Sequence, residues 1–247
     1  MKKILFCLMA AMVVSACQVG QLATLYNDKN SIEQDGVRVD AAGLPITGVY
    51  QKYSPSMRLM EEVHYVDGVI SGEYTAYNNK GKVILKAQYR KGEPHGKTTE
   101  YYANGREKEI SYYRKGKLAG RQLAYYDNGD LLRKGSYKNG LKNGVFEEFY
   151  PNGAVKTSVT YRNGVQHGPA RMYTKDNHLT NYTEYADGVR EGVAYSYYNN
   201  ETPHIFAYRK NDKLDGTAKV FNTRGELVEL ITYQDGAEIR RTKFTDK

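Results

Sequence analysis

The sequence predicts an all-β fold, a single-domain array of about eight stacked 24-residue β-hairpin repeats. Two observations lead to this prediction. Tyrosine recurs every 24 residues over most of the chain, and a glycine follows seven residues after each of these positions. The composition agrees, because 24 Tyr and 24 Gly among 247 residues suit many short strands joined by tight turns.

The repeat is defined by columns of residues that keep their spacing without insertions. The frame tyrosines are Tyr65, Tyr89, Tyr113, Tyr137, Tyr161 and Tyr185, with Arg209 and Tyr233 continuing the register. The repeat glycines are Gly48, Gly72, Gly96, Gly120, Gly144, Gly168, Gly192 and Gly216. Five residues after each glycine comes an aromatic: Tyr53, Tyr77, Tyr101, Tyr125, Phe149, Tyr173, Tyr197 and Phe221. A looser glycine column, exemplified by Gly81, Gly105 and Gly129, is interrupted at Met57, Asn177 and Glu201. Such regularity predicts that each unit stacks on the next.

Residues 72–96 show how one unit is expected to fold. We expect a strand over 73–77, a turn over 78–81, a second strand over 82–89 and a return to the next unit over 90–96. Alternate residues of a strand share a face. Val83, Leu85, Ala87 and Tyr89 therefore form one apolar set, and the sequence predicts one buried face and one wet face.

The pattern Tyr-x-x-Gly-x-x-x-Gly, followed by an aromatic pair and Asn-Gly, resembles the MORN repeat. It is most similar to the bacterial, tyrosine-rich YwqK-like antitoxin repeat, as in YRKGEPHGKTTEYYANG and YKNGLKNGVFEEFYPNG. The likeness covers residues 41 to about 240. It implies stacked hairpins that serve as a scaffold for proteins or lipids, with an antitoxin-like role as one form of that function.

The N-terminus predicts a lipid anchor. Lys2 and Lys3 precede an apolar run that is too short to span a bilayer and ends in Val-Ser-Ala-Cys at Cys17. This resembles the lipobox of bacterial lipoproteins, which implies cleavage before Cys17 and acylation of that residue. The alternative is an ordinary signal peptide cut near Ala16, which leaves a free cysteine. We expect a signal peptide over 1–16, the lipidated cysteine and a tether over 17–40, repeats over 41–240 and a charged tail over 241–247.

Sequence signals for catalysis are missing. The chain has no nucleophile elbow, no His-Glu-x-x-His, no phosphate-binding glycine loop and no cysteine pair. His95 and His167 share a repeat position, but three units of two strands place them roughly 30 Å apart. His64, His178 and His204 each fall at a different repeat position. We therefore expect no enzyme, no metal site and no cofactor.

The most prominent candidate surface is a basic stripe. Cations recur beside the frame position, so stacking lines them along one side of the array: Arg90, Lys91, Arg114, Lys115, Lys138 and Arg162. The stripe suits an acidic protein or lipid phosphates. The alternative is that these residues solvate hairpin tips and keep edges from pairing with another chain. The tyrosine columns likewise suit either stacking on a ligand or filling the core of the array.

These observations favour a non-catalytic repeat scaffold, anchored to a membrane by its N-terminal lipid, that binds a protein partner such as a toxin or an envelope protein. An immunity or antitoxin-like lipoprotein is the sharper form of this hypothesis. The alternatives are a structural or assembly scaffold of the cell envelope and a lipid- or glycan-binding module. The net charge of +8 does not favour nucleic acid, because the leader directs the chain out of the cytoplasm. Gln18, rather than Asp, follows the cysteine, so in a Gram-negative host we expect the outer membrane, facing the periplasm or the surface.

The anchor is tested at Cys17. We expect Cys17→Ser to abolish incorporation of radiolabelled palmitate and to block processing, because the thiol carries the lipid. The measurement is labelling of cells that express the parent or the variant. Equal labelling of the two proteins would show that the cysteine is not acylated.

Overall fold

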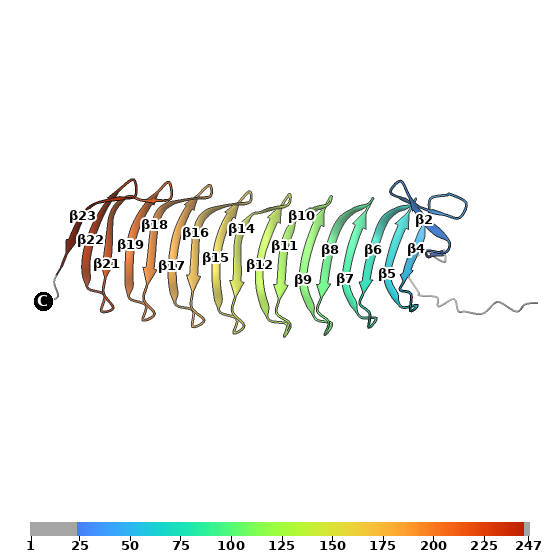
Figure 1. The fold of residues 1–247 in the computed structure, drawn as a ribbon, viewed down its shortest axis with the longest axis horizontal. Helices are drawn as coiled ribbons and strands as arrows, with labels where there is room; N and C mark the ends of the chain where they lie inside the picture. The colour runs from blue at the N-terminus through green and yellow to red at the C-terminus, as the bar shows by residue number, and fades with distance from the viewer. Residues whose placement is uncertain (1–23, 245–247) are drawn as a thin grey trace, which may run out of the picture.

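The computed structural model describes residues 24–244, and every regular element in that range is a β-strand. The signal peptide and Cys17 lie outside the described residues. One 21-stranded sheet extends as a single row from one end of the molecule to the other (Figure 1). The predicted all-β fold of stacked hairpins is confirmed. Within residues 24–244, no helix is long and apolar enough to cross a membrane.

The strands of the repeats follow one another in chain order along the row. They are β4 (Gly48–Tyr53), β5 (Leu59–Val66), β6 (Val69–Tyr77), β7 (Val83–Arg90), β8 (Glu93–Tyr101), β9 (Glu107–Arg114), β10 (Lys117–Leu118), β11 (Gly120–Tyr125), β12 (Leu131–Lys138), β13 (Leu141–Lys142), β14 (Gly144–Phe149), β15 (Val155–Arg162), β16 (Val165–Tyr173), β17 (Leu179–Ala186), β18 (Val189–Tyr197), β19 (Pro203–Lys210), β20 (Lys213–Leu214), β21 (Gly216–Phe221), β22 (Leu227–Gln234) and β23 (Ala237–Lys243). Neighbouring long strands pair antiparallel, so the sheet is a long meander. The short strands β10, β13 and β20 directly precede β11, β14 and β21 and pair with the same strand as they do, namely β9, β12 and β19.

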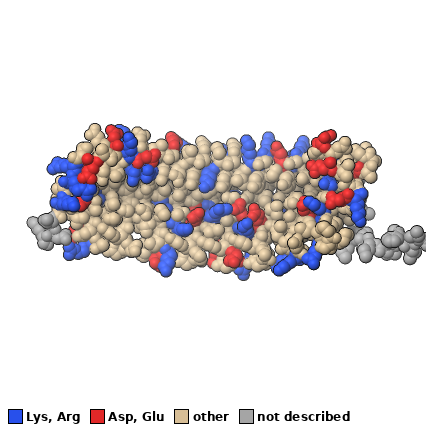
Figure 2. Space-filling model, viewed as in Figure 1, with Lys and Arg blue, Asp and Glu red and all other residues tan. Residues whose placement is uncertain are grey.

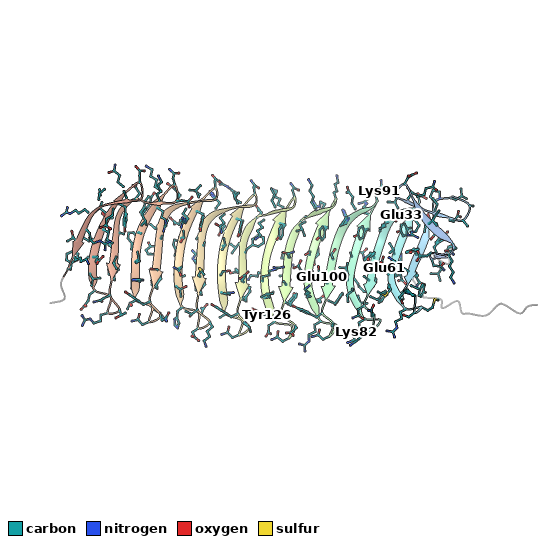
Figure 3. The ribbon with its side chains drawn as sticks, in the orientation of Figure 1. Glu33, Glu61, Lys82, Lys91, Glu100 and Tyr126 are labelled. Atoms are coloured by element: carbon teal, nitrogen blue, oxygen red, sulfur yellow. The ribbon has the colours of Figure 1, made fainter. Side chains whose placement is uncertain are left out.

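Two kinds of turn join the strands, one along each long side of the sheet. On the side that is uppermost in Figure 3, where Lys91 is labelled, two residues make each turn. Arg90 pairs with Glu93 across Lys91 and Gly92, whose φ values are 50° and 81°. Two consecutive positive φ angles are typical of a type I′ turn, whose twist matches that of a hairpin. The return predicted over residues 90–96 is therefore shorter than expected, and strand β8 already begins at Glu93.

The repeat glycine lies at a bulge, either inside a strand, as Gly96 in β8, or at the start of one, as Gly120 in β11. Ala87 pairs with Thr98 and Tyr89 with Pro94, so the single residue Gln88 opposes three residues centred on Gly96. At Gly96 φ is +100°, and an added Cβ would lie 3.3 Å from that of Gln88. All eight repeat glycines have positive φ. Because a bulge bends its strand, the strands curve as Figure 1 shows.

Hydrogen bonds at both long sides tie each repeat to the next. At the two-residue turns, the amide of Gly92 donates to the carbonyl of Ile70, 2.8 Å away in the preceding repeat. At the other side, the hydroxyl of Tyr126 donates to the carbonyl of Phe149 at 2.7 Å, and Asn152 reaches Lys175 at the same distance. These bonds recur along the array, so they hold successive hairpins in one register.

Side chains are buried chiefly against neighbouring strands of the same sheet. In β7 the predicted alternation is found, since Ala87 is buried and Lys86 is exposed. In β18, by contrast, every residue is partly buried. The prediction of one buried and one wet face is thus wrong for that strand. Over most of the array no second layer covers either face, so burial depends on how far each side chain reaches along the sheet.

Residues 24–40 are folded, which corrects this part of the tether predicted over residues 17–40; residues 17–23 lie outside the described range. Strand β1 (Leu25–Tyr26) pairs parallel with β4, and β2 (Ser31–Gln34) and β3 (Val37–Asp40) form a separate hairpin. The following Ile46 is only 1% exposed and packs with Tyr50 and Val63. This N-terminal cap, residues 24–46, covers the first repeat, which has no preceding repeat to pack against.

The charged tail predicted over residues 241–247 is also wrong in part. Residues up to Lys243 belong to β23, the last strand, which pairs with β22. Arg241 forms ion pairs with Glu229 and with Glu238, the latter at 2.7 Å. The charges therefore help to hold the terminal strand β23 against β22. The outer edge of β23 has no further partner among the described residues.

The backbone requirement of the glycine column is tested at Gly120, where φ is +91° and the nearest atom to an added Cβ is 3.9 Å away. Crowding is absent, so any loss must come from the backbone. We expect Gly120→Ala to lower the free energy of unfolding by about 1–3 kcal/mol, measured by denaturant melting. The control is Arg121→Ala, an exposed neighbour, with an expected change below about 0.5 kcal/mol. Equal losses in the two variants would contradict the requirement.

Candidate interaction surfaces

The two sides of the sheet present different side chains. We call the side that carries the frame tyrosines the tyrosine face and the other side the opposite face. Cross-strand partners share a face, so Ala87 and its partner Tyr74 lie on the tyrosine face with Tyr89. Lys86 and its partner Thr75 lie on the opposite face.

The predicted basic stripe is found along the two-residue turns. Arg162 is paired with Asp187 at 2.7 Å, and its guanidinium holds the pKa of that carboxyl below its ordinary value. Within residues 24–244, no ion pair engages the other five stripe residues, Arg90, Lys91, Arg114, Lys115 and Lys138. Figure 2 shows acidic residues interspersed with basic ones along this side. The stripe is therefore a row of separate exposed cations rather than a continuous basic surface.

The stripe does not protect a sheet edge. It runs along the ends of the strands, where the turn amides are already bonded to the preceding repeat, as at Gly116 and Pro94. The open ladder groups of the sheet lie instead at the two ends of the row, at β1 with the part of β4 that β1 does not cover, and at β23. Prevention of edge-to-edge pairing thus gives no reason for cations at these turns.

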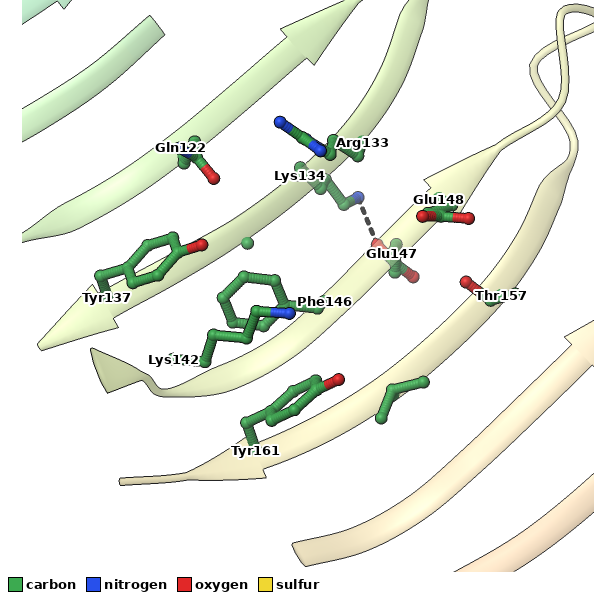
Figure 4. A pocket seen from close by; sticks show the side chains of 12 residues that line it. Gln122, Arg133, Lys134, Tyr137, Lys142, Phe146, Glu147, Glu148, Thr157 and Tyr161 are labelled. Atoms are coloured by element: carbon green, nitrogen blue, oxygen red, sulfur yellow. Dashed lines mark ion pairs between the residues drawn. The ribbon is translucent and has the colours of Figure 1, made fainter. Parts of the chain in front are cut away.

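A shallow depression of about 270 Å³ lies on the tyrosine face midway along the array (Figure 4). Phe146 makes edge-on contacts with Tyr137 and Tyr161, with ring centroids 5.4 and 5.2 Å apart. Its ring lies over Gly135, where an added Cβ would be 2.3 Å from the ring. The Lys142 ammonium lies 4.9 Å from the centre of Phe146 and 4.7 Å from that of Tyr161. The site thus combines an aromatic cluster with a cation, and Gly135 makes room for it.

A second aromatic pair lies under the N-terminal cap. Tyr50 and Tyr65 meet edge to face at 6.2 Å, and the Arg38 guanidinium lies 3.8 Å from the centre of the Tyr50 ring. The hydroxyl of Tyr50 donates to Asp28, whose carboxylate is 4.0 Å from Arg38. Burial, followed by the bond to Asp28, raises the pKa of Tyr50 to about 12. The chain therefore places one of its own arginines on its tyrosine face.

The opposite face carries an aromatic row in the C-terminal half of the array. Tyr182, Tyr195 and Phe206 are successive cross-strand partners, with ring centroids 5.5 and 5.1 Å apart. Arg171 lies over Tyr182 at one end of the row, and Lys219 lies 6.0 Å from Phe206 at the other. Sequence reasoning missed this row, because these positions lie between the repeating columns.

The histidines do not converge on a site. His167 lies 3.3 Å from Asp187, His178 contacts Glu201, and the ring of His204 packs on Tyr198. In the described part of the chain, no three His, Cys, Asp or Glu residues are grouped so that they could hold a metal ion.

Comparison with known proteins agrees with this architecture. The family model described as a MORN repeat variant matches residues 118–139 and 142–163, which run from the end of β10 into the turn after β15. The chain is a MORN-like repeat protein. No curated protein matches it. Among solved structures, a chain of the crystal structure of TcdB2-TccC3-Cdc42 is 12% identical, with a TM-score of 0.23; the match covers 84% of this chain and 13% of that one. This chain therefore spans about an eighth of the length of that one.

The stripe of the MORN-like array is tested by removing its charge. We expect the combined change of Arg90, Lys91, Arg114 and Lys115 to Gln to leave the sedimentation coefficient and the melting temperature nearly unchanged. The reason is that these tips bury little and shield no open strand. A shift of the variant to larger species, with the parent as control, would instead indicate that the stripe prevents edge-to-edge association.

Proposed function

We propose that this MORN-like protein is a non-catalytic scaffold, anchored to the cell envelope through Cys17, that binds a protein partner along its tyrosine face. The observation that carries the proposal is that the N-terminal cap covers this face only at the first repeat. Beyond the cap, the face continues through repeat after repeat without a covering layer in residues 47–244.

The chemistry of the face supports a protein partner. Tyrosine and arginine are enriched in the centres of protein interfaces, and both occur here, as at Tyr137 and Arg133 beside the depression. The side chains are held on paired strands, so little conformational entropy is lost when a partner binds. The array also offers a long surface, which suits an extended or elongated partner better than a small molecule.

The anchor and the cap fit this role together. A lipid on Cys17 lies only a few residues before the cap, which begins at residue 24. An anchored rod of this kind carries its binding face away from the bilayer. The absence of catalytic sequence motifs and the separation of the histidines support a binding function rather than an enzymatic one.

Site-specific photo-crosslinking in cells tests the proposal. Met172 and Val145 are matched positions, because they are 52% and 50% exposed and lie on the tyrosine and opposite faces respectively. We expect a photoreactive amino acid in place of Met172 to give a discrete protein adduct, and one in place of Val145 to give none. Adducts from both positions alike, or from neither, would contradict binding through the tyrosine face.

A further inference from the structure

We propose that Tyr74, Tyr89 and Glu61 form an open site for an arginine side chain of a basic partner segment, equivalent to the site that Arg38 fills one repeat earlier. The inference deepens the proposed function, on which it rests for the partner, and it names the chemistry that the N-terminal part of the tyrosine face recognises.

The filled site defines what the open one is expected to hold. The guanidinium of Arg38 stacks 3.8 Å from the centre of Tyr50 and lies 5.8 Å from that of Tyr65. It also donates to the hydroxyl of Ser31 at 3.3 Å and lies 4.0 Å from Asp28. One planar cation is thus held by two tyrosines and a carboxylate, an arrangement that suits arginine better than lysine because guanidinium is flat and weakly hydrated.

The second pair of tyrosines is the first pair moved by one repeat. Tyr74 and Tyr89 follow Tyr50 and Tyr65 by 24 residues each. Their ring centroids are 6.2 Å apart, the same distance as in the first pair. The interplanar angle is 63° in the second pair and 89° in the first. Both rings of the second pair are only partly buried.

A carboxylate accompanies the second pair as well. Glu61 is the cross-strand partner of Ala76, and Tyr74 is that of Val63, so Glu61 and Tyr74 are diagonal neighbours on one face. Burial and then the charge of Glu61 raise the pKa of Tyr74. The present partners of Glu61 are Lys52, at 3.2 Å, and the hydroxyl of Tyr74, and the Glu61 side chain remains 32% exposed. Figure 3 labels Glu61 midway along its strand, away from both rows of turns.

Aromatic pairs occupy these two repeat positions in three of the repeats, and the first and third pairs each have a cation over them. Tyr50 and Tyr65 carry Arg38, and Phe146 and Tyr161 carry Lys142. Within residues 24–244, no cation lies over Tyr74 and Tyr89, where the residue equivalent to Lys142 is Ile70. In the other repeats the first member of the pair is not aromatic: Thr98, Gln122, Ala170, Ala194 and Ala218. The open pair is therefore a single site rather than a feature of every repeat.

The test uses N-acetylarginine amide, with N-acetylcitrulline amide as its neutral equivalent of the same shape. The purified protein in detergent, labelled with ¹³C in its tyrosine rings, is titrated by NMR. We expect arginine amide to cause saturable shifts of the Tyr74 and Tyr89 signals, and citrulline amide to cause none. We expect Glu61→Gln and Tyr74→Leu to weaken binding roughly three- to tenfold, read at Tyr89.

Two further variants make the outcome decisive. Glu100→Gln changes a carboxylate on the same face that has no aromatic pair beside it, and it should leave binding unchanged. Arg38→Gln vacates the first pair and should add a second set of saturable shifts, at Tyr50 and Tyr65. Equal shifts with citrulline amide, or equal affinity in the parent and the folded Glu61→Gln variant, would overturn the site. Because no partner is present, this result is independent of the crosslinking experiment.

Discussion

A sheet without a second layer can bury a side chain only against its neighbours in the same row, and this constraint governs the repeats beyond the cap, residues 47–244. Each repeat must supply what the next one needs. A small residue such as Ala87 or Gly135 leaves space for a ring on the adjoining strand. A turn amide bonds back to the preceding repeat, and a tyrosine such as Tyr126 reaches forward to the following one. These mutual requirements explain why the same residues recur in columns along the sequence.

The hairpins and their turns could be predicted because they repeat. A backbone conformation that recurs at a fixed interval selects the same residue each time, as the repeat glycines do. The geometry persists even where the looser glycine column is broken, since Met57, Asn177 and Glu201 all adopt positive φ. The bulge at Gly96 was misjudged because a proline and a glycine close to a turn resemble a longer turn. In fact three residues of one strand oppose one residue of the other.

The cap and the candidate site could not be predicted in this way. Residues 24–46 occur once, so no periodicity distinguishes them from a tether. Arg38 lies twelve residues before Tyr50, and nothing in that spacing indicates that the two stack. The aromatic row from Tyr182 to Phe206 was missed for a related reason. Positions between the columns are free to vary, and the chemistry that distinguishes one repeat from another is found there.

The same division separates the residues that keep the backbone regular from those that differ between repeats. The columns keep the backbone regular, whereas the positions between them place an aromatic pair with a cation at one point of the tyrosine face and an aromatic row at another point of the opposite face. A residue on either face can therefore change without disturbing the turns. This arrangement lets one backbone present several unrelated surfaces along its length.

The meander also determines how the molecule bears load. Every strand is bonded to the strands beside it in the row, and the ladder runs from β4 to β23 through consecutive hairpins. Tension applied between the two ends pulls across the strands and peels them away one at a time from the terminal turn. Such unzipping breaks few hydrogen bonds at once, in contrast to shearing of parallel-loaded strands. The geometry of the meander therefore favours lengthening by one hairpin at a time over the simultaneous rupture of many strands.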